Sequence, residues 1–122
     1  MNKMKKILLL GALLLTSYAN ADNCDSARNT YDDIYCTNKV YASADAELNK
    51  NYQALRAKLS DKQKTTLKRS QLQWIRERDA NCTSDTGVNV NCRLETTQER
   101  NHWLQERLRE CKTIGCKSSA LH

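Results

Sequence analysis

Proline and phenylalanine are absent from this 122-residue sequence, and glycine occurs only three times. This composition excludes a collagen-like chain and a glycine-rich loop that could cradle a phosphate group. Large aliphatic residues are also few, because Leu, Ile and Val supply only 15 of the 101 residues in the segment 22–122. A core made from so few apolar side chains is small. The sequence therefore excludes a large multi-domain enzyme, a coenzyme-binding α/β domain and a polytopic membrane protein.

The first 21 residues have the three parts of an export signal. Lysines precede an apolar stretch from Ile7 to Leu15, and small residues follow at Ala19 and Ala21. We therefore expect residues 1–21 to be a signal peptide and residues 22–122 to be the mature domain. Its expected location is an oxidising compartment, the periplasm or the exterior of the cell, with no membrane span after cleavage.

Basic and acidic residues are interspersed along the mature segment. The formal net charge of +6 includes three lysines of the signal, so residues 22–122 carry 17 basic and 14 acidic residues, a net charge of +3. Nucleic-acid-binding domains instead gather basic residues into a patch or run. We therefore expect no nucleic-acid partner.

Apolar residues recur at helical spacing and not at the alternating spacing of strands. The first predicted helix runs from Asp33 to Leu59, and its apolar face repeats every seven residues. The residues with this spacing are Ile34, Tyr41, Leu48 and Leu55, and the same face is filled by Tyr31, Tyr52 and Leu59. A long amphipathic helix is therefore expected here.

Two further helices follow. The segment Ser60-Asp61-Lys62-Gln63 has the form of a capping box, which starts the second helix at about Asp61, and this helix ends at about Ala80. The residues from Thr83 to Gly87 have the composition of a turn. A third helix is expected from about Cys92, and Gly115 stands where its C-terminal cap could lie. Its buried face has spacings of three and four residues: Leu94, Thr97, Asn101, Leu104, Leu108 and Cys111.

These elements predict an all-α fold, a small antiparallel three-helix bundle stapled by disulfides. Six cysteines in an exported chain are expected to form three bridges, and they are Cys24, Cys36, Cys82, Cys92, Cys111 and Cys116. Cys111 and Cys116 lie at the far end of the third helix and are expected to pair with each other. The other four allow three pairings. We favour Cys36 with Cys82 and Cys24 with Cys92, and the local alternative is Cys24 with Cys36 and Cys82 with Cys92.

Polar residues interrupt the apolar faces of the predicted helices. Asp45 lies on the face of the first helix, where a carboxylate is costly unless it is paired, and counting across the turns places it level with Arg78 and Arg100. We therefore expect an ion pair between Asp45 and one of these arginines. We expect a structural polar layer that is buried between the helices, and it consists of Asp45, Asn49, Gln71, Trp74, Arg78, Asp79 and Arg100.

No catalytic arrangement is recognised. Glu99, His102 and Glu106 share one helical face, but this pattern is common on solvated helices and does not indicate a metal site. The cysteines are explained by bridges and not by nucleophilic catalysis, and no serine lies in a Gly-x-Ser-x-Gly turn. We therefore expect a protein that is not an enzyme and uses no cofactor or metal.

Three groups of residues resemble a known family. The first is Asp45-Ala46-Glu47-Leu48-Asn49 with Tyr52, the second runs from Gln71 to Cys82 and includes Trp74-Ile75-Arg76-Glu77-Arg78-Asp79, and the third is Cys92 with Thr97 to Arg100. In this order and spacing they resemble the N-terminal domain family of the lysozyme inhibitor LprI, from about Cys24 to Leu108. The resemblance implies an exported, helical, cysteine-bridged protein that binds and inhibits lysozyme or a related peptidoglycan hydrolase.

The sequence also departs from this family. The segment between Cys82 and Cys92 is shorter than is usual there, and the pair Cys111/Cys116 looks like an addition. A disulfide-closed loop loses little entropy when it enters a cleft, so the loop after Cys111 is a candidate plug. The possible partner contacts are Lys112, Thr113, Ile114 and Asp85. An alternative function is that of an immunity-like or envelope protein that binds another exported partner without inhibiting lysozyme.

Overall fold

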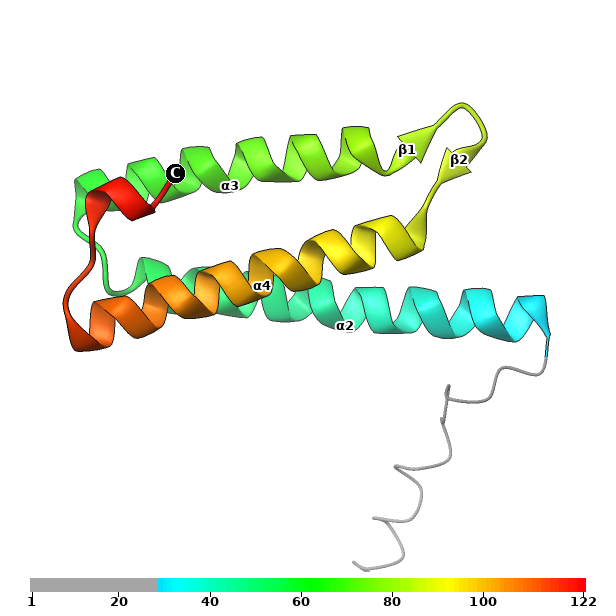
Figure 1. Cartoon of the computed structure of the whole chain (residues 1–122), viewed down its shortest axis with the longest axis horizontal. Coiled ribbons are helices and arrows are strands. Elements are labelled where there is room, and N and C mark those ends of the chain that lie inside the picture. The colour runs from blue at the N-terminus through cyan, green and yellow to red at the C-terminus, as the bar shows by residue number, and fades with distance from the viewer. Residues whose placement is uncertain (1–28) are drawn as a thin grey trace, which may run out of the picture. The chain divides into compact units, whose positions relative to one another are not determined.

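The computed structural model describes residues 29–122, and within them it confirms an all-α fold of three long helices. Helix α2 spans Thr30–Arg56, α3 spans Asp61–Asn81 and α4 spans Val90–Thr113 (Figure 1). The expected signal peptide and Cys24 lie outside the described residues. The chain divides into two compact units, Met1–Cys36 and Thr37–His122, with the boundary inside α2. The helical bundle belongs to the second unit.

Helix α2 starts three residues before the predicted position because Asn29 caps it. The Asn29 side-chain oxygen accepts a hydrogen bond from the backbone N–H of Asp32 at 2.9 Å. The predicted apolar face is buried only from Ala44 onward, where Leu48 and Leu55 are 5% and 0% exposed. Tyr31 and Ile34 are 79% and 55% exposed, so the N-terminal part of the predicted apolar face is not buried. A repeat of seven residues aligns side chains along a helix but does not specify what covers them.

The sharp turn between α2 and α3 is fixed by the predicted capping box. The Ser60 hydroxyl accepts a hydrogen bond from the backbone N–H of Gln63, and the Gln63 side chain accepts one from the backbone N–H of Ser60 at 3.0 Å. Leu59, immediately before the cap, is 7% exposed and joins the core. This turn places α3 antiparallel to α2 (Figure 1).

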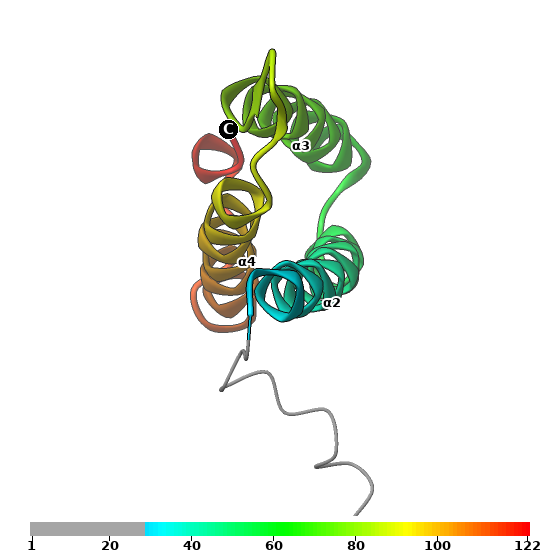
Figure 2. The same cartoon turned by 90° about the vertical axis from the view of Figure 1, so that its right-hand side faces the viewer.

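Helix α4 ends at Thr113, and the chain then reverses. Gly115 has a φ of +101°, and its N–H donates to the carbonyl of Glu110 at 2.9 Å. The predicted glycine cap is therefore present. Beyond it the short 3-10 helix η1, Ser118–Ala120, lies near the start of α3 (Figures 1 and 2). Leu121 follows and is 1% exposed within the core.

The connection between α3 and α4 is a small hairpin and not only the turn that its composition predicted. Strand β1, Thr83–Ser84, pairs antiparallel with β2, Gly87–Val88. Gly87 has a φ of +129°, which residues with a side chain rarely adopt. The two strands are too short to be separated from a turn by composition alone, because both consist of small or turn-forming residues apart from Val88.

The apolar core of the second unit is made of leucines from all three helices and the C-terminal segment. It consists of Leu48, Leu55, Leu59, Leu67, Leu104 and Leu121. In the end-on view of Figure 2, α4 lies beside both α2 and α3. No helix in the described part of the chain is long and apolar enough to span a membrane.

Candidate functional site

Arg78 is the centre of the polar layer between the helices. Its side chain is 8% exposed. Its Nη1 donates to Asp45 and to the Thr97 hydroxyl, both at 3.3 Å, and its Nε donates to Asp79 at 3.0 Å. The guanidinium also lies 5.1 Å from the centre of the Trp74 ring. The expected ion pair between Asp45 and an arginine is therefore formed, with Arg78 as the partner.

The carboxylates of this layer lie at its edge. The side chains of Asp45 and Asp79 are 50% and 42% exposed, and Asn49 is exposed. The prediction that Asp45 is buried and that Asn49 belongs to a buried layer was wrong. The buried charge belongs to the arginine, since its long apolar stem can pack between helices while the short aspartate on α2 stays near solvent.

Arg100 of α4 is buried as predicted, but it is held by neutral groups. It is 8% exposed, and it donates from Nε to Gln71 at 2.9 Å and from Nη2 to Ser70 at 3.0 Å. Its guanidinium lies 3.8 Å from the centre of the Trp103 ring. Burial lowers the pKa of Arg100 to about 10.

Two polar residues that the sequence placed on the α4 face complete the layer. Thr97 is fully buried, and Asn101 is 5% exposed. The Asn101 amide donates to the backbone carbonyl of Ala44 at 3.0 Å and accepts from the Asn51 amide at 3.1 Å. These bonds join α4 to α2. Their spacing predicted the burial of Thr97 and Asn101, but no sequence signal identified their partners.

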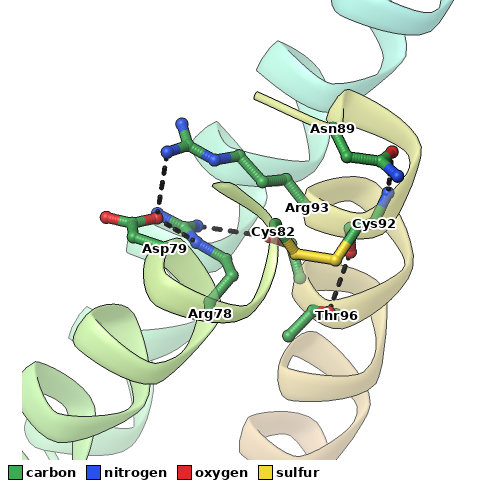
Figure 3. Close-up of a disulfide and its surroundings, with 8 residues drawn as sticks. Arg78, Asp79, Cys82, Asn89, Cys92, Arg93 and Thr96 are labelled. Carbon is green, nitrogen blue, oxygen red and sulfur yellow. Dashed lines mark hydrogen bonds and ion pairs between the residues drawn. A yellow bond between two sulfur atoms is a disulfide. The ribbon is translucent and has the colours of Figure 1, made fainter. Parts of the chain in front are cut away.

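The disulfide Cys82–Cys92 closes the base of the hairpin. The two Cα atoms are 5.4 Å apart, the Asn89 side chain caps α4 by accepting from the N–H of Cys92, and the Asn89 N–H donates to the Cys82 carbonyl at 2.8 Å. Arg93 reaches Asp79 at 3.5 Å, which ties the hairpin base to the polar layer (Figure 3).

This bridge shows that the favoured pairing, Cys36 with Cys82 and Cys24 with Cys92, was wrong. The Cys82–Cys92 bond of the local alternative is correct. The connection between α3 and α4 is short, so it brings the end of α3 close to the start of α4. Cys82 and Cys92 lie at these two ends, and closing the short loop between them costs little entropy. Cys36 is also in a disulfide.

The hairpin beyond this bridge is an exposed, polar element that extends past the ends of α3 and α4, which it connects (Figure 1). Every residue from Thr83 to Asn89 is exposed, and Val88 is 50% exposed. Asp85 and Thr86 form the two-residue tip between the paired Ser84 and Gly87. One carboxylate therefore lies at the end of a covalently closed hairpin.

A second closed loop lies after α4. The predicted Cys111–Cys116 disulfide is present. Lys112, Thr113 and Ile114 are exposed, with Ile114 at 69%. The Gln63 side chain donates to the Cys116 carbonyl at 3.3 Å, which holds the returning chain against the start of α3. This loop therefore anchors the C-terminal segment as well as presenting exposed residues.

Two pockets lie next to the polar layer in the described part of the chain. An apolar groove between α2 and α3 has a volume of about 480 Å³ and is lined in part by Leu48, Tyr52 and Ile75. A pocket of about 300 Å³ lies over α3 and α4, where Arg100, Trp74 and His122 take part in its lining. No local pattern of residues predicts this pocket, because His122 reaches it only through the reversal of the chain after α4.

The comparisons with known proteins agree with the resemblance in the sequence. No curated protein and no solved structure matches the chain. The model of the family described as lysozyme inhibitor LprI matches residues 21–104. This segment contains the polar layer and the Cys82–Cys92 hairpin, and it ends before the Cys111–Cys116 loop. Since the match covers well over half of the sequence, the chain belongs to the lysozyme inhibitor LprI family.

Proposed function

We propose that the chain is an exported, non-enzymatic protein that binds and inhibits a lysozyme or a related peptidoglycan hydrolase. The observation that carries this proposal is the family match over residues 21–104, because this family is one of inhibitors. Two disulfides within the second unit suit an oxidising compartment. In this proposal residues 1–21 are removed on export, and residues 22–122 form the inhibitor.

The hairpin closed by Cys82–Cys92 is the proposed principal contact. It lies inside the matched segment, it is exposed along its length, and its base is fixed by the disulfide and the Asn89 cap. A rigid element loses little conformational entropy on binding. Its tip also carries the carboxylate of Asp85, which can pair with a cationic group of the enzyme.

Charge supports a local contact more than long-range attraction. Residues 22–122 carry a net charge of +3, and animal-type lysozymes are strongly basic, so the two proteins repel each other at a distance. Binding must then depend on complementarity at the contact itself. Asp85 supplies the negative charge for it, and the loop of Lys112, Thr113 and Ile114 is a second contact that lies outside the matched segment.

The test of the function is a cell-wall lysis assay with the mature, oxidised protein titrated into several types of lysozyme. We expect a dose-dependent loss of lysis for at least one type. No inhibition of any type at micromolar inhibitor would overturn the proposal and favour an envelope protein with a different partner.

Variants then locate the contact. Asp85→Lys should weaken inhibition by about tenfold or more, whereas Glu99→Lys, an exposed residue within α4 with the same change of charge, should not. If both variants inhibit like the parent protein, the hairpin is not the contact. A double variant, Lys112→Ala with Ile114→Ala, tests the second loop in the same way, and unchanged inhibition would remove it from the interface.

A further inference from the structure

Arg100 is a buried cation that has no carboxylate partner in the described part of the chain. Arg78, the other buried arginine of the polar layer, has two carboxylates within 3.3 Å. By contrast, the two side-chain hydrogen bonds of Arg100 go to the neutral oxygens of Gln71 and Ser70. Burial without a counter-charge disfavours the charged form, which is why the pKa of Arg100 falls.

One nitrogen of Arg100 is available to a ligand. Nε and Nη2 are occupied by Gln71 and Ser70, and Nη1 has no hydrogen-bond partner within residues 29–122. Nη1 is not sealed from solvent, in contrast to the unpaired Nε atoms of Arg93 and Arg107. Trp103 and Trp74 hold the guanidinium at 3.8 Å and 5.7 Å from their ring centres. The free donor is therefore held in a fixed position.

Arg100 is one of the residues that line the pocket of about 300 Å³ over α3 and α4, and Nη1 is its one nitrogen without a partner among residues 29–122. One face of α3 forms most of its wall, because residues 66, 69, 70, 73, 74 and 77 recur at helical spacing. Arg69 and Arg100 contribute positive charge, and Glu77 contributes the one acidic side chain. Trp74 gives a flat apolar wall, and Gln73 gives a neutral polar group. The pocket thus combines two cations, an aromatic face and groups that can bond to hydroxyls.

We propose that this pocket binds a small organic anion, whose carboxylate or phosphate pairs with Arg100 and Arg69 and whose ring or apolar part packs against Trp74. A bound anion offsets the cost of the buried cation, and arginine is well suited to hold oxyanions. The volume matches ligands of about the size of one sugar ring. This proposal does not depend on the inhibitor function.

The test is calorimetric titration of the mature, oxidised protein. The first probes are N-acetylmuramic acid and N-acetylglucosamine, which share a sugar ring but differ in a carboxylate-bearing side chain. Inorganic phosphate serves as the smallest oxyanion. We expect the acid to bind, the neutral sugar to bind at least about tenfold more weakly, and phosphate to compete with the acid.

Two variants on α3 provide a matched comparison. Arg69 lines the pocket, and Arg76, two turns further along the same helix, does not. Arg69→Gln should weaken binding of the acid by about tenfold, whereas Arg76→Gln, with the same change of net charge, should leave it unchanged. Both side chains are exposed, so neither change should unfold the bundle.

Three results would overturn the proposal. They are no measurable binding of any anion at millimolar concentration, equal binding of the acid and the neutral sugar, and equal weakening by the two arginine variants. Arg100→Lys adds a further check, because it keeps the charge but removes the fixed Nη1 donor, and it should weaken binding while circular dichroism shows an intact fold.

Discussion

The ion pairs of Arg78 with Asp45 and Asp79 allow a test of which member of each pair carries the cost of burial. Arg78 is 8% exposed, whereas Asp45 and Asp79 are 50% and 42% exposed. If the desolvation cost falls on the guanidinium, either carboxylate alone can still offset it. We therefore expect Asp45→Ala and Asp79→Ala each to lower the free energy of unfolding by about 1 kcal/mol, as for a partly exposed ion pair.

The double variant leaves Arg78 buried, and of its three hydrogen-bond partners in the described residues only the Thr97 hydroxyl remains. Breaking all pairs of a buried charge costs about 3 to 5 kcal/mol. The loss should therefore be about 4 kcal/mol, which exceeds the sum of the two single losses by about 2 kcal/mol. Alanine has a higher helix propensity than aspartate, but the gain in the double variant is the sum of the gains in the two single variants, so it cancels in the coupling energy.

Adding Arg78→Met to the double variant should restore part of the lost stability, because methionine packs against Trp74 without an unpaired charge. Arg76→Met on the exposed side of the same helix should restore nothing. Urea unfolding of the oxidised protein, followed by far-UV circular dichroism, gives the free energies. Additive losses within about 0.5 kcal/mol, or no rescue by Arg78→Met, would refute the assignment of the buried charge.

Three other changes test the fold by urea or thermal unfolding. Leu55 is fully buried and Leu72 is 46% exposed, so Leu55→Ala should cost about 3 kcal/mol and Leu72→Ala less than about 1 kcal/mol; equal losses would contradict the position of the core. Ser60→Ala removes the capping box and should cost about 1 kcal/mol, and an unchanged melting temperature would argue against the cap. Replacing Cys82 and Cys92 by serine opens a loop with a sequence separation of 10 and should cost about 3 kcal/mol; a stability equal to that of the parent would show that the bridge does not restrain the unfolded chain.

The helices were predictable because their signals are local. Ser60 and Gln63 form a cap through residues three apart, and Gly115 ends a helix through its own backbone conformation. The burial of Leu104 and Thr97 followed from the spacing of the α4 face. Each of these features depends on the order of neighbouring residues, which the sequence states directly.

The errors concern contacts between distant residues. Counting along helices placed Cys36 level with Cys82, but it did not include the direct approach of α3 and α4 across the short hairpin. The same counting found the Asp45 and Arg78 pair and assigned the burial to the wrong member. The pocket beside Arg100 depends on three separate segments, including the returning C-terminus, so no local pattern predicted it.

The two ends of the bundle are stabilised by different means. Near the turn between α2 and α3 the interior is apolar, with Leu55 and Leu67 fully buried. Toward the hairpin the interior positions include Arg78 and Thr97, whose hydrogen bonds contribute less net free energy than apolar burial of the same extent. The bridge at Cys82 restricts the unfolded chain at this less apolar end. A sequence with few aliphatic residues can therefore hold a polar, exposed hairpin on a fixed base, and a fixed base keeps the entropy loss on binding small.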